Sequence, residues 1–398
     1  MLTVIFLFYS TVEVEITESI RNADLYTRIL RNEIVLASGY TEPISVAYCA
    51  AKAHQILGMQ PTSVTVSVSD LILKSLKGVV IPNTNGLTGI RAAIAAGIIC
   101  GDVDKEMQVI GSVSEEQRSA VADFMSSINI DVSCAETDCP LYISMTLYAR
   151  TSYSRVVIAD GYFNIVEIMK NGEILFKRPI AAQNDAESDD ASCLNLHDIF
   201  EYAKGIEIAG VLDLLTMQID CNMAICEEGL NRHFGADFGK VFLHKDRSDI
   251  AGLAKAYTVS GCEARMNGCE LPVAILCGSG NQGITATVPV ICYAKHYTID
   301  QERLNRALIL SDLLTIYLST NRGRFSSYCG AMNAGCAAGA SIAYLSGEDE
   351  DAVIQTFNNA ISMMTDMKCD GAKPSCAAKI AAAIDTGVLG YHMVLRNR

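Results

Sequence analysis

Two cysteines, Cys369 and Cys376, flank a short segment near the end of the chain that cannot continue a helix. The segment reads CDGAKPSC, and its Gly371 and Pro374 force a turn that could bring the two sulfur atoms to one centre. The usual zinc motif pairs its thiols at a closer spacing. The nearest candidate for a third ligand is Cys329, in the glycine-rich stretch GRFSSYCGAMNAG.

Three thiolates are one ligand short of the four that hold a saturated iron–sulfur cluster. Such a deficit would leave one metal position open, as catalytic metal sites do. Alternatively, the three are unrelated buried cysteines, since the chain has 15 cysteines and most of them lie in apolar runs. A structural zinc site is a weaker third possibility. The thiol pattern alone leaves these interpretations open.

A second polar stretch, CGSGNQGITATVP (277–289), interrupts apolar sequence and contains Ser279, Asn281 and Gln282. Backbone N–H groups and side-chain amides in such a loop could bind a carboxylate. A tight turn explains the same residues equally well. The stretch matches neither the Walker motif nor the dinucleotide fingerprint, so it does not indicate nucleotide binding.

Charge and composition exclude several classes of protein. The net charge of −14 and the pI near 4.9 argue against nucleic acid as a partner. The apolar N-terminus MLTVIFLFY is too short to cross a bilayer, so no membrane partner is expected. Many cysteines in a long chain favour a reducing compartment, and we expect a cytoplasmic protein that could form a homo-oligomer.

Apolar periodicity outlines the elements that must position these residues. Helical spacing covers residues 18–56, with a break at SGYTEP, and alternation predicts a strand in 63–73. Residues 90–102 read as a helix of small residues. Strands are expected at MQVIGSV, DVSCAE and LYISMTLYAR, with a helix at 114–128 between the first two. A β-meander follows, whose turns contain Asp160-Gly161 and Asn171-Gly172.

These patterns predict an α+β fold, a mainly helical host domain with a small α+β (β-meander) insertion. The first part of the helical catalytic domain covers 18–103, the insertion 104–180, and the second part 196–398. Residues 1–17 form an extension of uncertain order, and 181–195 an acidic linker. The clearest helix follows Asp300, which can cap it, and Glu302 favours its first turn.

Taken together, several motifs resemble one known family, the iron–sulfur-dependent L-serine dehydratase α-chain proteins, and especially their L-cysteine desulfidase branch. The similarity runs from about residue 26 to residue 390, with the pieces in the family's order. The motifs that carry it are GYTEPISVAYCAA, GVVIPNTNGLTGI, NMAICEEGL, EARMNGCELPV, GSGNQGITATVPV, GRFSSYCGAMNAG and CDGAKPSCAAKI.

The resemblance implies that Cys329, Cys369 and Cys376 hold a 4Fe–4S cluster in which one iron is not bound by protein. It implies α,β-elimination from a small L-amino acid, L-cysteine or L-serine, to give pyruvate and ammonia, with sulfide from cysteine. The implied enzyme is a carbon–sulfur or carbon–oxygen lyase that does not use pyridoxal phosphate. Lys373, beside the cluster cysteines, could bind the substrate carboxylate or neutralise the negative charge of the cluster, although a solvated lysine is an equal alternative.

Tyr40 departs from the family pattern. The usual motif is G-C-T-E-P, whose cysteine has been suggested to abstract the proton, and this chain has Tyr40 in its place. Tyrosine, with an ordinary pKa near ~10, acts as a base only when strongly activated. Three interpretations follow. Tyr40 acts as the base, or another group does. In the third, the standard activity is lost and the protein acts as an amino-acid sensor or assembly subunit. Thr41 and Glu42 remain as candidates for orienting substrate, although Glu42 could instead cap the following helix.

Overall fold

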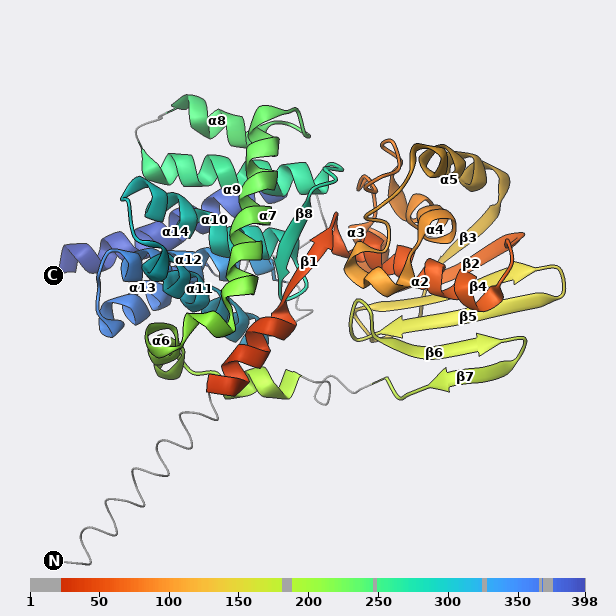
Figure 1. Cartoon of the computed structure of the whole chain (residues 1–398), viewed down its shortest axis with the longest axis horizontal. Helices are drawn as coiled ribbons and strands as arrows, with labels where there is room; N and C mark the ends of the chain where they lie inside the picture. Colours follow the sequence, from red (N-terminus) through yellow and green to blue (C-terminus); the bar gives the residue numbers. More distant parts are fainter. Residues whose placement is uncertain are drawn as a thin grey trace, which may run out of the picture.

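The structure, a computed structural model, describes residues 23–180, 188–245, 249–323, 328–364, 367 and 375–397. Within these ranges the chain forms two lobes, one mainly helical and one built on a sheet (Figure 1). The predicted α+β class with a dominant helical part is confirmed. Among the described helices, none combines the length and apolar character that a membrane span needs.

Six strands form the sheet of the second lobe, in the order β3-β2-β4-β5-β6-β7. Only β2 and β3 run parallel, and the other neighbours are antiparallel. Asn171 and Gly172 both have positive φ angles at the turn between the last two strands, as the sequence predicted. The strands are β2 (Ser63–Val68), β3 (Asn129–Cys134), β4 (Tyr142–Ala149), β5 (Ser152–Ala159), β6 (Ile165–Lys170) and β7 (Glu173–Lys177).

Helices cover one face of this sheet (Figure 1). They are α2 (Thr41–Leu57), α3 (Asp70–Ser75), α4 (Gly89–Cys100) and α5 (Glu115–Ser127). Helix α2 packs against β4, β5 and α4, and one hydrophobic core extends from Ile44 to Ile158. The segment before residue 104 thus shares a core with the predicted insertion, and the domain boundaries inferred from the sequence stay a prediction.

The other lobe is a bundle of helices around a second hydrophobic core. It holds α6 (Leu196–Gly205), α7 (Leu212–Asn231), α8 (Phe238–Lys245), α9 (Ile250–Met266), α10 (Gly280–His296), α11 (Gln301–Arg322), α12 (Gly330–Leu345), α13 (Glu350–Met363) and α14 (Ser375–Asn397). Short 3-10 helices lie at η2 (Ser188–Cys193) and η3 (Ile208–Gly210).

Small residues allow α12 and α14 to pack with their backbones almost in contact. A Cβ atom placed on Gly339 would lie 2.3 Å from the carbonyl oxygen of Gly387, and one on Gly387 would lie 2.2 Å from that of Gly335. Real Cβ atoms do not approach so closely, so these positions accept only glycine without a shift of the helices. This contact fixes how the beginnings of the two helices lie relative to each other.

A two-stranded antiparallel sheet crosses from one lobe toward the other. Strand β1 (Ile34–Ser38) pairs with β8 (Pro272–Leu276), with Ile34 opposite Leu276 and Ser38 opposite Pro272. The sequence interpretation assigned residues 34–37 to a helical stretch that breaks at SGYTEP, and this assignment is wrong. The β-branched pair Ile34-Val35 suits a strand, but its partner is far away in the sequence, so no local pattern reveals the pairing.

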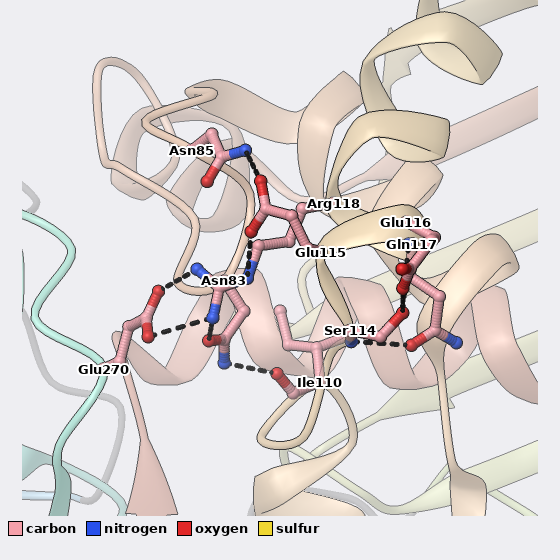
Figure 2. Close-up of polar contacts among 9 residues, drawn as sticks. All are labelled: Asn83, Asn85, Ile110, Ser114, Glu115, Glu116, Gln117, Arg118 and Glu270. Carbon is pink, nitrogen blue, oxygen red and sulfur yellow. Dashed lines mark hydrogen bonds and ion pairs between the residues drawn. The ribbon is translucent and has the colours of Figure 1, made fainter.

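A polar network ties the sheet lobe to the helical lobe (Figure 2). Arg118 on α5 forms a two-point ion pair with Glu270, which precedes β8, and its Nη2 also donates to Asn83 Oδ1 at 2.9 Å. Asn83 Nδ2 donates to the carbonyl of Ile110 at 2.8 Å. The glycine-rich loop that contains Asn83 is thereby linked, through Arg118, to Glu270 of the helical lobe.

Local sequence signals predict most of these elements. Helix α11 begins after Asp300, whose Oδ1 accepts from the N–H of Arg303 at 2.9 Å, as expected. The strand expected at MQVIGSV is wrong: this region contains the 3-10 helix η1 (Val103–Gln108) and turns. Val109 and Ile110 are buried there outside any strand, so their apolar character reflects burial and not sheet pairing. Residues 1–17 and 181–187 of the predicted extension and linker lie outside the described ranges.

Candidate active site

Each of the four glycine-rich stretches singled out from the sequence leads into the N-terminus of a helix. SGYTEP joins β1 to α2, and the stretch around Ser279 joins β8 to α10. Cys329 is the N-cap residue of α12, and Cys376 is the second residue of α14. Helix N-termini carry partial positive charge and unpaired N–H groups, so each favours a nearby anion or thiolate.

The two described cysteines of the predicted ligand set lie near a third buried thiol, that of Cys262 on α9. Burial raises the pKa of Cys262 to about 12, and the thiols of Cys376 and Cys329 add to this effect. Helix α14, which carries Cys376, packs against both α9 and α12, in agreement with these charge effects at Cys262. Cys329 and Cys376 are both buried. The fold therefore brings these two helix beginnings together.

Two further predicted residues, Cys369 and Lys373, lie outside the described ranges. Among the residues that are described, no group of three His, Cys, Asp or Glu side chains is arranged to hold a metal ion. The predicted set of three thiols thus stays a prediction, of which the structure describes two members.

The amide side chains at the start of α10 contact neighbouring helices. Ser279 caps α10 by accepting from the N–H of Gln282 at 3.4 Å. Gln282 Nε2 donates to Ser319 Oγ at 2.9 Å, and Asn281 Oδ1 accepts from Arg265 Nε at 3.0 Å. Asn281 and Gln282 therefore hold α9 and α11 against α10, while their predicted role in substrate binding stays a prediction.

Sequence reasoning did not single out Arg265, which lies at the centre of the site and is 1% exposed. Its Nη1 donates to the carbonyl of Gly39 at 3.0 Å, and its guanidinium carbon lies 5.0 Å from the centre of the Tyr40 ring. Arg265 thus connects α9 and α10 to the start of α2. The available signal was a cation near the end of the apolar segment GCEARM in the quoted motif EARMNGCELPV.

Tyr40, Glu42 and Tyr162 form a second cluster beside Arg265. Glu42 is buried, and desolvation raises the pKa of its carboxyl above the ordinary value. The positive charge of Arg265 and hydrogen bonds from the side chains of Tyr40 and Tyr162 oppose that rise. Glu42 is therefore a carboxylate held by two phenols, an arrangement typical of groups that carry protons in catalysis.

Tyr162 is another residue that sequence reasoning missed. It lies in the Asp160-Gly161 turn between β5 and β6, and reaches Glu42 from there. A cavity of about 170 Å³ borders Tyr162 and is lined also by Val35, Met107 and Gly278. Small ligands thus have space beside this side chain.

A larger hollow of about 560 Å³ lies elsewhere on the helical lobe, where Lys204, Arg303 and Glu350 contribute to its lining. It includes none of the predicted site residues.

Comparison with known proteins gives one family and a set of relatives. The family model described as serine dehydratase alpha chain matches residues 104–398. A UPF0597 protein of Desulfitobacterium hafniense is 45% identical over 92% of this chain and 86% of its own length. UPF0597 proteins of Finegoldia magna and Bacteroides thetaiotaomicron are 40% and 34% identical, over 94% and 93% of this chain and 89% and 87% of theirs.

Proposed function

Because the chain belongs to the serine dehydratase alpha chain family, we propose that it catalyses α,β-elimination from a small L-amino acid, L-cysteine or L-serine. The products would be pyruvate and ammonia, with sulfide from cysteine. The observation that carries the proposal is the joint position of buried thiols, a buried arginine and a phenol–carboxylate pair at one set of helix beginnings.

The described thiols fit the iron–sulfur group that the family implies. Cys329 and Cys376 are buried at helix N-termini, where a thiolate is stabilised, and thiolates are the ligands of such clusters. Cys369 would be the third ligand by the resemblance. When bound, a cluster with one iron free of protein ligands would act as a Lewis acid on the leaving group.

Tyr40 and Glu42 are suited to take the Cα proton. The Tyr40 hydroxyl donates to Glu42, so Tyr40 could accept the proton from the substrate while its own proton passes to the carboxylate. A raised pKa makes the ionised Glu42 a stronger base. The electron pair of the broken C–H bond forms the C=C bond of aminoacrylate as the hydroxide or thiolate leaves with its bonding pair.

Anaerobic reconstitution with iron and sulfide, followed by a pyruvate assay on both amino acids, tests the proposal. We expect Tyr40→Phe and Glu42→Gln to lower kcat by about 100-fold or more, as loss of a general base does. Tyr48→Phe, on the same helix, is the matched control and should retain activity. Activity that persists in both site variants would show that a group other than Tyr40 and Glu42 takes the Cα proton.

A second candidate function, a catalytically silent amino-acid sensor or assembly subunit, is favoured by Tyr40 at the family's cysteine position. No pyruvate from either amino acid by the wild-type protein, at full iron and sulfide content, would favour this alternative. Tyr40→Cys separates the two: gained elimination supports silence in the natural protein, and lost elimination supports a functional tyrosine.

A further inference from the structure

Arg265 is a buried cation that forms no ion pair with the carboxylates of the described ranges. Its two hydrogen-bonded nitrogens contact neutral acceptors, the side-chain oxygen of Asn281 and the backbone oxygen of Gly39, each at 3.0 Å. Its third nitrogen, Nη2, is buried and has no hydrogen-bond partner among the described residues. Leaving a buried charge without a counter-ion is unfavourable.

The titratable groups around Arg265 do not supply the missing anion. Cys262 lies one turn earlier on α9, and its thiol faces the backbone oxygen of Asn281. Glu42 acts on Arg265 only through space, because Nε and Nη1 of Arg265 donate to other oxygens and Nη2 has no partner among the described residues. Tyr40 offers the face of its ring. The site thus lacks one anion beside Nη2.

Thr41 presents a second unsatisfied group at the same place. Its hydroxyl is buried, at 2% exposure of the residue, and has no hydrogen-bond partner in the described part of the chain. Thr41 is the first residue of α2 and follows Gly39 and Tyr40, which Arg265 contacts. Two independent buried donors, from α2 and α9, therefore lack an acceptor.

Local packing keeps space for the guanidinium. A Cβ atom on Gly280 would lie 2.7 Å from Cδ and 2.9 Å from Cζ of Arg265, so any larger residue at the start of α10 would displace this side chain. Asn281 then fixes its orientation through Nε. Because the Arg265 side chain is already held in one orientation, it loses little conformational entropy when an anion binds, as in a preorganised binding site.

We propose that Arg265 Nη2 and the Thr41 hydroxyl bind the α-carboxylate of the substrate, which restricts the site to small amino acids with a free carboxylate. This inference rests on the proposed function for the identity of the ligand, while the two unsatisfied donors stand by themselves. Arginine suits the role because its rigid, planar donors match a carboxylate better than lysine does.

Binding of L-alanine, which has no β-leaving group, tests the subsite apart from catalysis. Calorimetric titration of the purified protein, with and without reconstituted iron, would compare L-alanine with L-alaninamide, which lacks the carboxylate. We expect Arg265→Gln to weaken L-alanine binding by about 10- to 100-fold, the effect of one charged hydrogen bond. Alaninamide should bind weakly to both proteins, with no difference between them.

Thr41 gives an independent test if Arg265→Gln does not fold. Thr41→Val should weaken L-alanine binding by about 5- to 10-fold, the worth of a neutral hydrogen bond, and Thr41→Ser should restore it. Arg303→Gln, on α11 and bonded to the carbonyl of Tyr344, is the matched control for loss of a partly buried arginine.

Unchanged L-alanine affinity in the Arg265 and Thr41→Val variants would overturn the subsite, and so would absence of L-alanine binding by the wild-type protein. Equal losses for alanine and alaninamide would also overturn it, because they would show a structural role. Elimination at unchanged kcat/KM in Arg265→Gln would refute the subsite and keep the proposed function. Carboxylate-dependent binding without pyruvate formation would support the subsite and refute the proposed function.

Discussion

Asp312 on α11 is fully buried, and its surroundings predict that it carries a proton at neutral pH. Its Oδ1 accepts from Gln218 Nε2 at 3.1 Å. Its Oδ2 and the Gln218 Oε1 are both buried and have no partner within the described residues. A proton on Oδ2 could be donated to Oε1, which would satisfy both atoms in a cyclic acid–amide pair. Burial raises the pKa of Asp312 to about 8, although the Gln218 hydrogen bond opposes this.

The size of the effect follows from proton linkage. The ordinary pKa of the carboxyl is 3.8, and the folded state raises it to about 8, so folding takes up a proton between these values. The stability that this proton contributes is complete below pH 3.8 and is lost as pH rises to about 8. The free energy of unfolding falls by about 1.4 kcal/mol per pH unit in the range where the folded protein holds the proton and the unfolded chain does not.

Asp312→Asn replaces the acid proton with an amide N–H and keeps both hydrogen bonds to Gln218. The free energy of unfolding of this variant should not fall between pH 5 and pH 7 as that of the wild-type protein does. The difference between the two free energies should therefore grow by about 3 kcal/mol over this range. Urea unfolding followed by far-ultraviolet circular dichroism is the assay, since the chain has no tryptophan. Asp138→Asn, in an exposed loop, is the matched control. Parallel stability curves for wild type and Asp312→Asn across pH 5 to 8 would refute the reasoning.

Two further substitutions test how the fold holds the site. Gly339→Ala would place a Cβ 2.3 Å from the backbone of Gly387, so we expect a loss of about 2 kcal/mol or more, measured by thermal unfolding. Gly205→Ala, where a Cβ meets nothing within 4 Å, is its control, and equal melting temperatures for the two would contradict the close packing of α12 on α14. Glu270→Ala removes the partner of Arg118 between the lobes, and because Glu270 is half exposed the loss should be only about 0.5 to 1 kcal/mol. A loss that does not shrink in 1 M salt would show that the ion pair is not its source.

Local signals in the sequence account for many of the elements. Asp300 starts α11 because its side chain accepts from a backbone N–H three residues later, an interaction that needs no distant partner. Asn171-Gly172 forms its turn because both residues tolerate positive φ angles. The four glycine-rich breaks were recognisable for the same reason, and their cysteines and polar residues gave the family resemblance that the comparisons support.

Long-range packing determined what the sequence did not reveal. Residues 34–38 form a strand only because β8 is available to pair with them. Arg265 contacts the carbonyl of Gly39 from 226 positions away, and Tyr162 reaches Glu42 from the distant turn between β5 and β6. Nothing near these residues in the sequence specifies those contacts.

The sequence by itself determined the types of chemical group in this protein and the helix beginnings on which most of them lie. Capping, turn formation and periodicity act over a few residues, and the chain carries those signals directly. Only the tertiary structure decided that Arg265 lies over Tyr40 with an unsatisfied nitrogen, and that Asp312 is buried against Gln218. Burial and charge compensation depend on every element that packs around a group, so they are properties of the folded chain.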